Sequence, residues 1–366
     1  MDKSPSNPST LHPVPTHFNY PALLAAACTH APLSIILPLW TYARNLGFDP
    51  CWNLDCARGL AKCLIDVSAE VYATFLSPFP TLTTARSRLV AKRKEVDPLY
   101  VVKDACSLLL RLQQPVEYLG VYVGSELTFC TILCRLLAYI VKQQSPEFAE
   151  CKCIARHLYR TVLLPALTIS APNPTLHYEL WEGLQHFSQA ERFALYTAWQ
   201  SEQTAQCADV MYAMKYNYKT VDYYKRRMYC DNVEECMRAI MIVSFKSPVH
   251  YFRQLFDRCM RFQDQIKLIF PHMKCLSPLA VDVGCFTLLE FLQTCERHPA
   301  NDMLSISSMY EGLTETITEF VVHVNDRLDM TVMMNYLIKE IQKDVQAVLV
   351  LDKMIMTIAH VSGDRL

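Results

Sequence analysis

Glycine is scarce in this sequence, with only 8 Gly among 366 residues. Tight turns and phosphate-binding loops need glycine, because it adopts positive φ angles and lets the backbone approach a ligand closely. The scarcity therefore argues against a β-rich fold and against a nucleotide-binding α/β fold. It favours helices.

A large net charge is also absent. The 35 Lys and Arg residues nearly balance the 36 Asp and Glu residues, which leaves a formal net charge of −1. The chain as a whole therefore has no electrostatic attraction to nucleic acid. Charged residues make up only 19% of the sequence and hydrophobic residues 51%, so the chain is able to bury large cores.

The short motifs of common enzyme classes are missing from the sequence. It contains no nucleophile elbow, no zinc-protease H-E-x-x-H, no P-loop and no dinucleotide-binding G-x-G-x-x-G. Gly124 and Ser125 are adjacent, but in a stretch with helical periodicity and without a second glycine. We predict a protein that is not an enzyme and that has no catalytic residues and no cofactor, although scattered Cys, His and Asp can form a triad that a sequence does not reveal.

Paired zinc-ligand elements are missing as well, although the sequence has 16 Cys. A structural zinc site needs two closely spaced cysteine pairs that converge. The nearest groupings do not provide this spacing twice: Cys51, Cys56 and Cys63; Cys151 and Cys153; Cys230 and Cys236. Most cysteines lie in apolar helical stretches, and the N-terminal residues are polar and proline-rich without a secretory signal. We therefore predict reduced cysteines, a reducing compartment and no metal.

One hydrophobic stretch, residues 21–40, is long enough to cross a membrane. It contains His30, Pro32 and Pro38. These residues favour two short buried helices over a transmembrane helix, although proline is tolerated in membrane helices. We therefore expect no membrane partner.

Apolar residues recur at helical spacing from about residue 17 almost to the C-terminus, most clearly in residues 249–260 and 330–358. Helix starts are marked by a cap-forming residue followed by Pro, which fits the first turn of a helix. Such pairs begin at Ser77, Asp97, Ser145, Asn173, Ser247 and Ser277, although residues 77–80 look more like a loop. Both Ser188 with Glu191 and Asp231 with Glu234 resemble capping boxes. The pattern predicts an all-α fold, an α-solenoid of HEAT-like repeats built from antiparallel helix pairs.

The same pattern divides the chain into three parts. Residues 1–16 are expected to form a flexible tail, and residues 17–170 an N-terminal helical region. The polar sequence SAPNPT at residues 170–175 marks the start of a helical-repeat region at residues 171–366. Because this boundary is short, we expect the two helical regions to pack together.

A first basic cluster puts five cations in a short polar stretch: Arg86, Arg88, Lys92, Arg93 and Lys94. It fits a nuclear import signal or a phosphate contact, and it also fits a solvated loop or helix end.

A second cluster interleaves tyrosines with cations over residues 212–229, including Lys215, Lys219, Lys225, Arg226, Arg227, Tyr216 and Tyr218. Tyrosine stacks on bases while Lys and Arg bind phosphates, so the cluster fits a partner or RNA surface. On a helix the same residues can form a packed aromatic face beside a face of solvent-directed cations. The packed arrangement is the one that we expect.

Residues 163–200 resemble the large second subunit of the THO complex, the THO complex subunit 2 family. The matching positions are Leu164, Pro165, Ala166, Leu167, Asn173, Pro174, Trp181, Arg192, Phe193, Leu195, Tyr196 and Trp199. Tryptophans in helical patterns are usually core anchors, so we expect Trp181, Arg192, Tyr196 and Trp199 to be structural.

The resemblance continues in order toward the C-terminus. Lys225 and Arg226 stand where the family has a basic pair, and Ser247 with Pro248 resembles a family helix start that is one residue longer. Residues 256–270, 276–289, 329–337 and 348–353 are similar to successive family helices, the second of them through Asp282 and Val283. Upstream of residue 163 the chain shares only helical character with the family.

The resemblance implies a HEAT-like scaffold in a nuclear THO/TREX-like complex that couples transcription to mRNA processing and export. It implies that residues 171–366 have the fold of the initiation-factor scaffold's middle domain and dock a DEAD-box RNA helicase, while the upstream region contacts other THO subunits. Family chains are far longer and end in a basic tail that binds nucleic acid. The absence of that tail from this sequence implies a fragment or a reduced subunit, with RNA contacted at most indirectly.

Two other functions stay open on the sequence alone. One is a cytoplasmic helical-repeat adaptor of another complex. The other is a direct RNA-binding helical module that uses residues 212–229.

Overall fold

The computed structural model describes residues 20–76, 102–296, 307–324 and 326–359, and within these ranges it contains helices and no β-strand. The first helices are α1 (Tyr20–His30), α2 (Leu33–Asn45), α3 (Leu54–Val71), α5 (Ala105–Leu119), α6 (Leu127–Lys142), α7 (Ala149–Leu158), α8 (Leu164–Ile169) and α9 (Pro174–Leu184). The predicted all-α, helical-repeat fold is confirmed.

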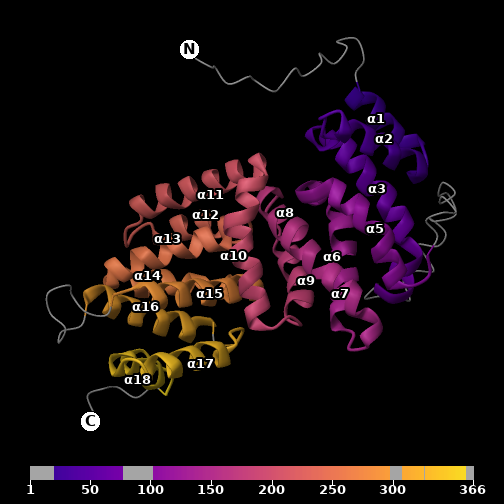
Figure 1. The fold of residues 1–366 in the computed structure, drawn as a ribbon. Coiled ribbons are helices and arrows are strands. Elements are labelled where there is room, and N and C mark those ends of the chain that lie inside the picture. Colours follow the sequence, from indigo (N-terminus) through magenta and orange to yellow (C-terminus); the bar gives the residue numbers. More distant parts are fainter. Residues whose placement is uncertain (1–19, 77–101, 297–306, 325, 360–366) are drawn as a thin grey trace, which may run out of the picture.

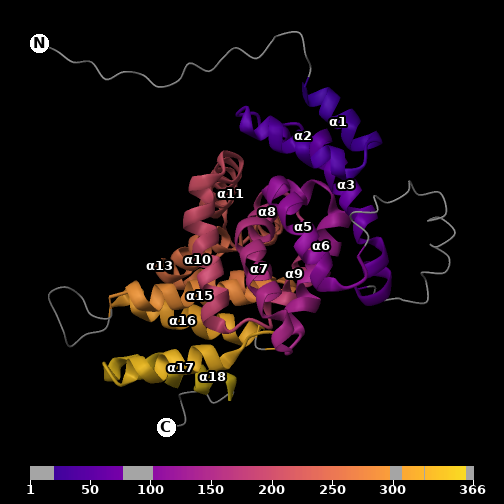
Figure 2. The same cartoon turned by 45° about the vertical axis from the view of Figure 1, so that its right-hand side comes forward.

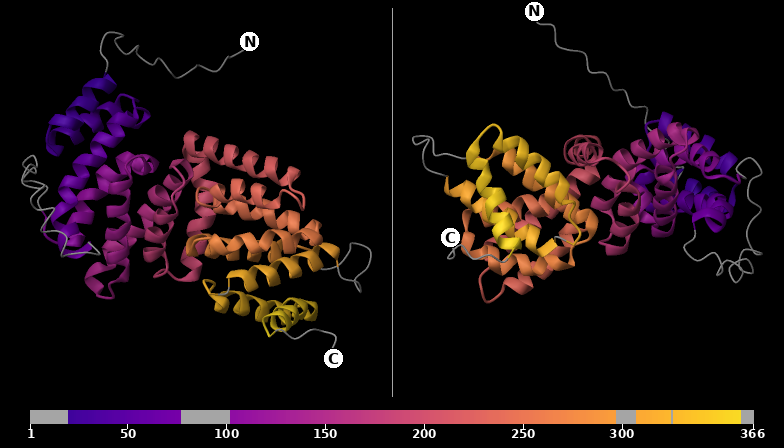
Figure 3. Two further views of the ribbon diagram at one scale, coloured as in Figure 1. Left: turned by 180° about the vertical axis from the view of Figure 1, so that it is seen from behind. Right: turned by 90° about the horizontal axis from the view of Figure 1, so that it is seen from below.

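The second half of the chain forms a stack of helices that lie side by side (Figure 1 and, from behind, Figure 3). After α10 (Gln189–Gln206) come α11 (Ala208–Arg227), α12 (Val233–Ser244), α13 (Pro248–Arg261), α14 (Ile266–Ile269), α15 (Pro278–Thr294), α16 (Ser308–Val324), α17 (Met330–Ile341) and α18 (Val348–Ile358). Helix α11 lies at the outer edge of this stack, and α1 and α18 lie at opposite ends of an elongated molecule (Figure 2).

The two halves of the chain share one hydrophobic core. Helix α9 packs against α6 on one side and against α15 on the other, and α8 contacts α11. Helices that precede residue 170 therefore contact helices that follow it, which gives α11 a fixed place relative to both halves.

The helix starts follow the cap chemistry at three of the predicted positions. Asn173 Oδ1 accepts from the backbone N–H of Thr175 at 3.0 Å, and Ser277 Oγ accepts from that of Ala280 at 3.2 Å. Ser188 and Glu191 form the predicted capping box: Glu191 Oε2 accepts from the Ser188 N–H at 2.8 Å, and Ser188 Oγ accepts from the Glu191 N–H at 3.4 Å.

Other predicted caps are wrong or lie outside the described residues. Ser247 precedes α13 without capping it, because its hydroxyl accepts from Asn217 Nδ2 at 2.9 Å instead. Helix α12 begins after Asn232, so Asp231 is not its cap. Ser145 precedes only a short 3₁₀ turn and makes no side-chain cap bond. Ser77, Asp97 and the expected tail at residues 1–16 lie outside the described residues.

The hydrophobic residues 21–40 form the predicted pair of short helices, α1 and α2, which are separated at Ala31 and Pro32. No helix in the described residues is long and apolar enough to span a membrane. The expectation that both helices are buried is wrong. In α1 only Leu24 and Cys28 are buried, and Leu23 is 60% exposed. In α2 one face is exposed. Ile35, Leu39, Tyr42 and Leu46 are spaced at one or two helical turns and are 44–61% exposed.

The cysteines are all free, and most are buried or partly buried. Burial raises the pKa of the Cys28 thiol and of the Cys259 thiol, each to about 12, so these thiols stay protonated near neutral pH. Among the described residues no group of three or more His, Cys, Asp and Glu side chains is placed to hold a metal ion. The thiols therefore act as small apolar side chains in the core.

Candidate docking face on helix α11 and the junction behind it

Two regions contain most of the described residues that the sequence singled out. One is a buried junction among α8, α9, α10 and α15, and the other is the outer surface of α11. The junction holds the first half of the chain against the helix stack, so it determines where α11 stands.

The junction is centred on an ion pair between Arg192 of α10 and Asp282 of α15, whose side chains are 8% and 9% exposed. Arg192 Nε and Nη2 donate to the two carboxylate oxygens of Asp282 at 2.9 and 3.0 Å. Tyr196 donates its hydroxyl proton to Asp282 at 2.7 Å. The third guanidinium nitrogen donates to the carbonyl of Phe187 at 2.9 Å, and the guanidinium carbon lies 5.5 Å from the ring centroid of Trp181. The charges of this buried pair are thus matched by hydrogen bonds.

The protonation states in the junction are fixed by the same contacts. Burial and then the negative charge of Asp282 raise the pKa of the Tyr196 hydroxyl well above its usual value. Burial disfavours the Arg192 cation, but the hydrogen bonds and charge of Asp282 outweigh this and raise the pKa of the guanidinium. Tyr196 therefore remains a hydrogen-bond donor and Arg192 remains a cation over any ordinary pH range.

A second polar link joins α9 to the helix stack through His177. Its Nε2 lies 3.0 Å from the carbonyl oxygen of Phe245, and its Nδ1 lies 2.8 Å from Ser277 Oγ. Because a carbonyl only accepts, Nε2 carries the proton and Nδ1 accepts from the Ser277 hydroxyl. Burial lowers the pKa of this imidazole to about 4. His177 is therefore a neutral, fully bonded core residue.

Trp199 and Trp181 differ in burial. Trp199 is 1% exposed, and its indole N–H donates to Thr168 Oγ1 of α8 at 3.0 Å. Trp181 is only partly buried and packs against the edge of the core. All four motif residues, Trp181, Arg192, Tyr196 and Trp199, thus make packing or hydrogen-bond contacts within the junction and offer no open reactive group.

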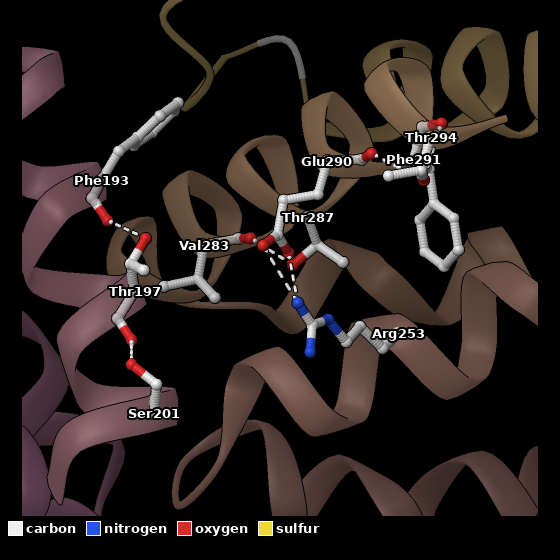
Figure 4. A network of polar contacts seen from close by, with 9 residues as sticks. All are labelled: Phe193, Thr197, Ser201, Arg253, Val283, Thr287, Glu290, Phe291 and Thr294. Atoms are coloured by element: carbon white, nitrogen blue, oxygen red, sulfur yellow. Dashed lines mark hydrogen bonds and ion pairs between the residues drawn. The ribbon is translucent and has the colours of Figure 1, made fainter.

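Polar contacts farther from the junction are weaker or local (Figure 4). Thr197 and Thr287 each donate to a carbonyl one turn earlier in their own helix. Arg253 of α13 and Glu290 of α15 form an ion pair at 2.8 Å, but their side chains are 47% and 32% exposed. Water screens such a pair, so it adds little to stability.

Helix α11 contacts the stack through one narrow stripe. Its buried residues are Val210, Met214, Asn217 and Val221, which recur at intervals of three or four and so lie on one side of the helix. The start of α11 is also tied to the N-terminal half, since Tyr122 donates its hydroxyl proton to Asp209. The helix is therefore held along one side only.

The opposite side of α11 carries tyrosines in solvent. Tyr212, Tyr216 and Tyr223 are 74%, 64% and 50% exposed. Their spacing of four and seven residues puts them on one side of the helix. The expected packed aromatic face is therefore wrong. It fails because α11 lies at the edge of the stack, where no further helix of the described residues covers this side.

Exposed cations surround these tyrosines. Lys215, Lys219, Arg226 and Arg227 are all exposed, and the Arg227 guanidinium carbon lies 3.7 Å from the ring centroid of Tyr223. Arg226 is 74% exposed and pairs with Asp222 at 2.9 Å. We call Tyr212, Lys215, Tyr216, Lys219, Tyr223, Arg226 and Arg227 the α11 face. Tyrosine and arginine are enriched where proteins bind partners, and an exposed aromatic row of this kind is typical of a binding surface.

Three groups of predicted site residues fall elsewhere. Tyr218 turns toward α13, where its ring lies 6.4 Å from that of His250. Lys225 is only 16% exposed and lies 3.5 Å from Asp222. Both therefore flank the α11 face. The first basic cluster, Arg86 to Lys94, lies outside the described residues.

The site residues predicted from the sequence omit two members of the face, Tyr212 and Tyr223, although both belong to the tyrosine- and cation-rich segment 212–229. Helical projection from the apolar residues Val210, Met214 and Val221 is the signal that identifies them. The predicted site residues also omit the exposed α2 stripe, whose spacing of Ile35, Leu39, Tyr42 and Leu46 is visible in the sequence once α2 is recognised as apolar on two sides.

Comparison with known proteins gives one family. A sequence model described as "THO complex subunit 2 N-terminus" matches residues 96–238. THO complex subunit 2 from Homo sapiens is 27% identical over 156 residues, which are 42% of this chain and 10% of that protein. The protein of the same name from Arabidopsis thaliana is 22% identical over 144 residues, or 39% of this chain and 8% of that protein. The match thus spans about a tenth of the length of these relatives.

The matched region differs in extent from the resemblance seen in the sequence. It starts at residue 96, upstream of residue 163. Residues 96–162 therefore have sequence similarity to the family, and not only the helical character that the sequence indicates. The matched region contains the motif residues Trp181, Arg192, Tyr196 and Trp199 and the whole of α11, and it ends at residue 238, before Asp282.

The fold and its site define an all-α helical-repeat protein with an exposed tyrosine- and cation-rich face on one edge helix. Within that class, its sequence is similar over residues 96–238 to the N-terminal part of THO complex subunit 2.

Proposed function

We propose that the chain is a non-enzymatic scaffold subunit of a nuclear THO/TREX-like complex, which couples transcription to mRNA processing and export. The observation that carries this proposal is the family match over residues 96–238, because it includes both the motif that builds the junction and the helix that presents the α11 face. A scaffold needs rigid helices with exposed anchor residues, and the α11 face supplies exposed aromatic and cationic side chains on a fixed helix.

The partners in this proposal are other THO complex subunits and a DEAD-box RNA helicase. We assign the helicase to the helical-repeat region at residues 171–366 and the other THO subunits to the region at residues 17–170, as the resemblance implies. The shared core between the two regions supports a role in holding partners at a fixed separation.

Co-purification tests the proposed complex. The tagged full chain, expressed in cells that contain both classes of partner, should recover THO subunits and a DEAD-box helicase from nuclear extract. A matched variant in which Lys219 and Tyr216 are replaced, Lys219→Glu with Tyr216→Ser, should keep the fold and shows whether the α11 face takes part. Recovery of neither partner from an extract that contains both would contradict the proposal.

Nuclear import by Arg86, Arg88, Lys92, Arg93 and Lys94 is a separate part of the proposal. Replacing all five with glutamine should reduce nuclear accumulation of a fluorescent fusion, whereas exchanging Arg for Lys and Lys for Arg keeps the charge and should leave accumulation unchanged. Equal distribution of the glutamine variant and the wild type would favour a cytoplasmic adaptor.

Direct RNA binding is a second candidate function, and the exposure of Tyr212, Tyr216 and Tyr223 favours it. Exposed rings between lysines and arginines suit stacking and phosphate contacts. Titration of the purified chain with single-stranded RNA at increasing salt decides between the two functions, because phosphate contacts make affinity fall steeply with salt. RNA binding that is weak and unaffected by Lys215→Glu with Lys219→Glu would exclude this function for α11.

A further inference from the structure

A surface pocket of about 350 Å³ lies directly beyond the C-terminal end of α11. Met228, Val233, Leu268 and Ile269 are apolar residues of its lining and are buried or partly buried, so they form its base. Among the described residues that line it, the charged ones are Asp231 and Asp264, both exposed. The pocket therefore combines an apolar base with a negative rim.

The walls of this pocket are held by hydrogen bonds that do not involve the rim carboxylates. Asn232 Oδ1 accepts from the backbone N–H of Tyr229 at 2.7 Å, and Asn232 Nδ2 donates to the carbonyl of Arg227 at 2.8 Å. Behind the wall, Arg258 donates to the carbonyl of Met228 at 3.1 Å and to Gln265 Oε1 at 2.5 Å. The loop is thus organised before any ligand arrives, which lowers the entropic cost of binding.

The pocket lining follows the α11 face directly along the chain, and the charged residues of the two surfaces have opposite sign. Arg226 and Arg227 end α11, and the pocket lining begins with the next residue, Met228. From there the cations of the face continue back along the helix through Lys219 to Lys215. A ligand that contacts both surfaces meets the apolar pocket with its two carboxylates and then the tyrosines and cations of the α11 face.

We propose that the pocket and the α11 face together bind an extended peptide segment of a partner protein. An apolar side chain of the segment enters the pocket, a neighbouring Lys or Arg pairs with Asp264, and a run of acidic residues lies along α11 against Lys219 and Lys215. The stretch from Arg226 to Tyr212 is about 20 Å long at the rise of an α-helix, which about six extended peptide residues cover.

Charge is the reason for choosing a peptide over a nucleic acid. A single strand is attracted to the cations of α11, but its phosphates are repelled at Asp231 and Asp264 and its bases gain little from the apolar floor. A peptide can match both signs of charge and supply the apolar anchor. This inference concerns the purified chain alone and does not use its place in a complex, so it and the co-purification test fail independently.

Fluorescence anisotropy with synthetic peptides tests the inference on the full-length chain. The probes are two peptides of identical composition and opposite order, each with a leucine–arginine pair at one end and a run of glutamates at the other. Of the two peptides, only the one whose order matches the arrangement of the pocket and the α11 face should bind saturably. Replacing its leucine with glycine should weaken binding about tenfold or more, because the anchor supplies most of the affinity.

Charge exchange provides the decisive control. Asp264→Lys should weaken binding of the selected peptide about fivefold, and the same variant should regain affinity for a peptide whose arginine is changed to glutamate. Lys219→Glu should weaken binding by a similar factor. The matched exposed positions Glu311→Lys on α16 and Lys62→Glu on α3 should have no effect.

Three outcomes would overturn the inference. The first is the absence of saturable binding by either peptide, and the second is binding that Asp264→Lys leaves unchanged. The third is tighter binding of a uridine oligonucleotide of matched length that depends on Lys219 but not on Asp264, which would make the surface a nucleic-acid site.

Discussion

The buried junction and the α11 face contain the same types of side chain, but these side chains pack inside the fold in the junction and are exposed to solvent on α11. In the junction, Arg192 and Tyr196 meet a carboxylate from a helix on the other side, Asp282 of α15. On α11, Tyr212 and Tyr216 face solvent, because this helix is the last one at its edge of the stack. The difference shows that the partner of a tyrosine or an arginine, more than its position on a helix, decides whether it stabilises the fold.

Removing the carboxylate of Asp282 from the junction should have the largest effect on stability. Asp282→Ala leaves the Arg192 cation buried without its ion-pair partner, and we expect a loss of about 3–5 kcal/mol in the free energy of unfolding. Urea denaturation measures it. The matched variant Glu290→Ala removes the acid of an exposed pair with Arg253, and its loss should be about 0–1 kcal/mol. Similar losses for the two variants would show that burial does not separate them.

The pH dependence of stability tests the neutral His177 next. Its pKa is about 4 in the folded chain, below its ordinary value of 6.5. Between these values the unfolded chain binds a proton that the folded chain does not bind, so stability falls as the pH drops from about 6.5 toward about 4. This titration of His177 lowers the free energy of unfolding by up to about 3 kcal/mol.

His177→Gln separates this effect from other titrations. Glutamine can donate to the Phe245 carbonyl and accept from Ser277 but does not titrate, so the variant should lose less stability than the wild type between about pH 7 and about pH 4.5. Unfolding free energies at the two pH values give the difference. Equal losses in both proteins would mean that His177 is not held neutral by burial.

The two tryptophans provide a smaller contrast within the junction. Trp199→Phe removes the N–H that bonds to Thr168 in a fully buried position and should cost about 1–3 kcal/mol. Trp181→Phe keeps a ring beside Arg192 at the edge of the core, and its cost should stay near 1 kcal/mol or below. Thermal unfolding of both variants ranks them, and a larger loss for Trp181→Phe would mean that burial does not determine which indole stabilises the fold more.

The sequence predicts the junction's helices but not its contacts. Capping at Asn173, Ser277 and Ser188 is local chemistry within three residues, so a pattern is enough to find it. Arg192 and Asp282 are 90 residues apart. Both lie in helices, and helical periodicity does not indicate which residues of two helices contact each other. The resemblance to THO complex subunit 2 named both residues but not the contact between them.

The same limit explains the error on α11. Helical periodicity correctly divides the segment into a Val210–Met214–Val221 side and a tyrosine side. It does not tell whether another helix covers the second side, because that depends on where α11 falls in the order of the stack. At Asp231 a local rule failed for a similar reason: Asn232 closes the end of α11 through the Arg227 carbonyl, and the start of α12 has no side-chain cap.

The smallest effect on stability is expected where the effect on binding is largest. Tyr212→Ser combined with Tyr216→Ser should change the free energy of unfolding by only about 0.5 kcal/mol, since these side chains are 74% and 64% exposed. The same double variant should weaken partner binding about tenfold, because aromatic anchors carry much of the energy of an interface. Tyr178→Ser on α9, where the side chain is 51% exposed, is the matched control and should affect neither property. A loss of several kcal/mol in the double variant would mean that the tyrosines of α11 pack within the fold, and the distinction between the two regions would then disappear.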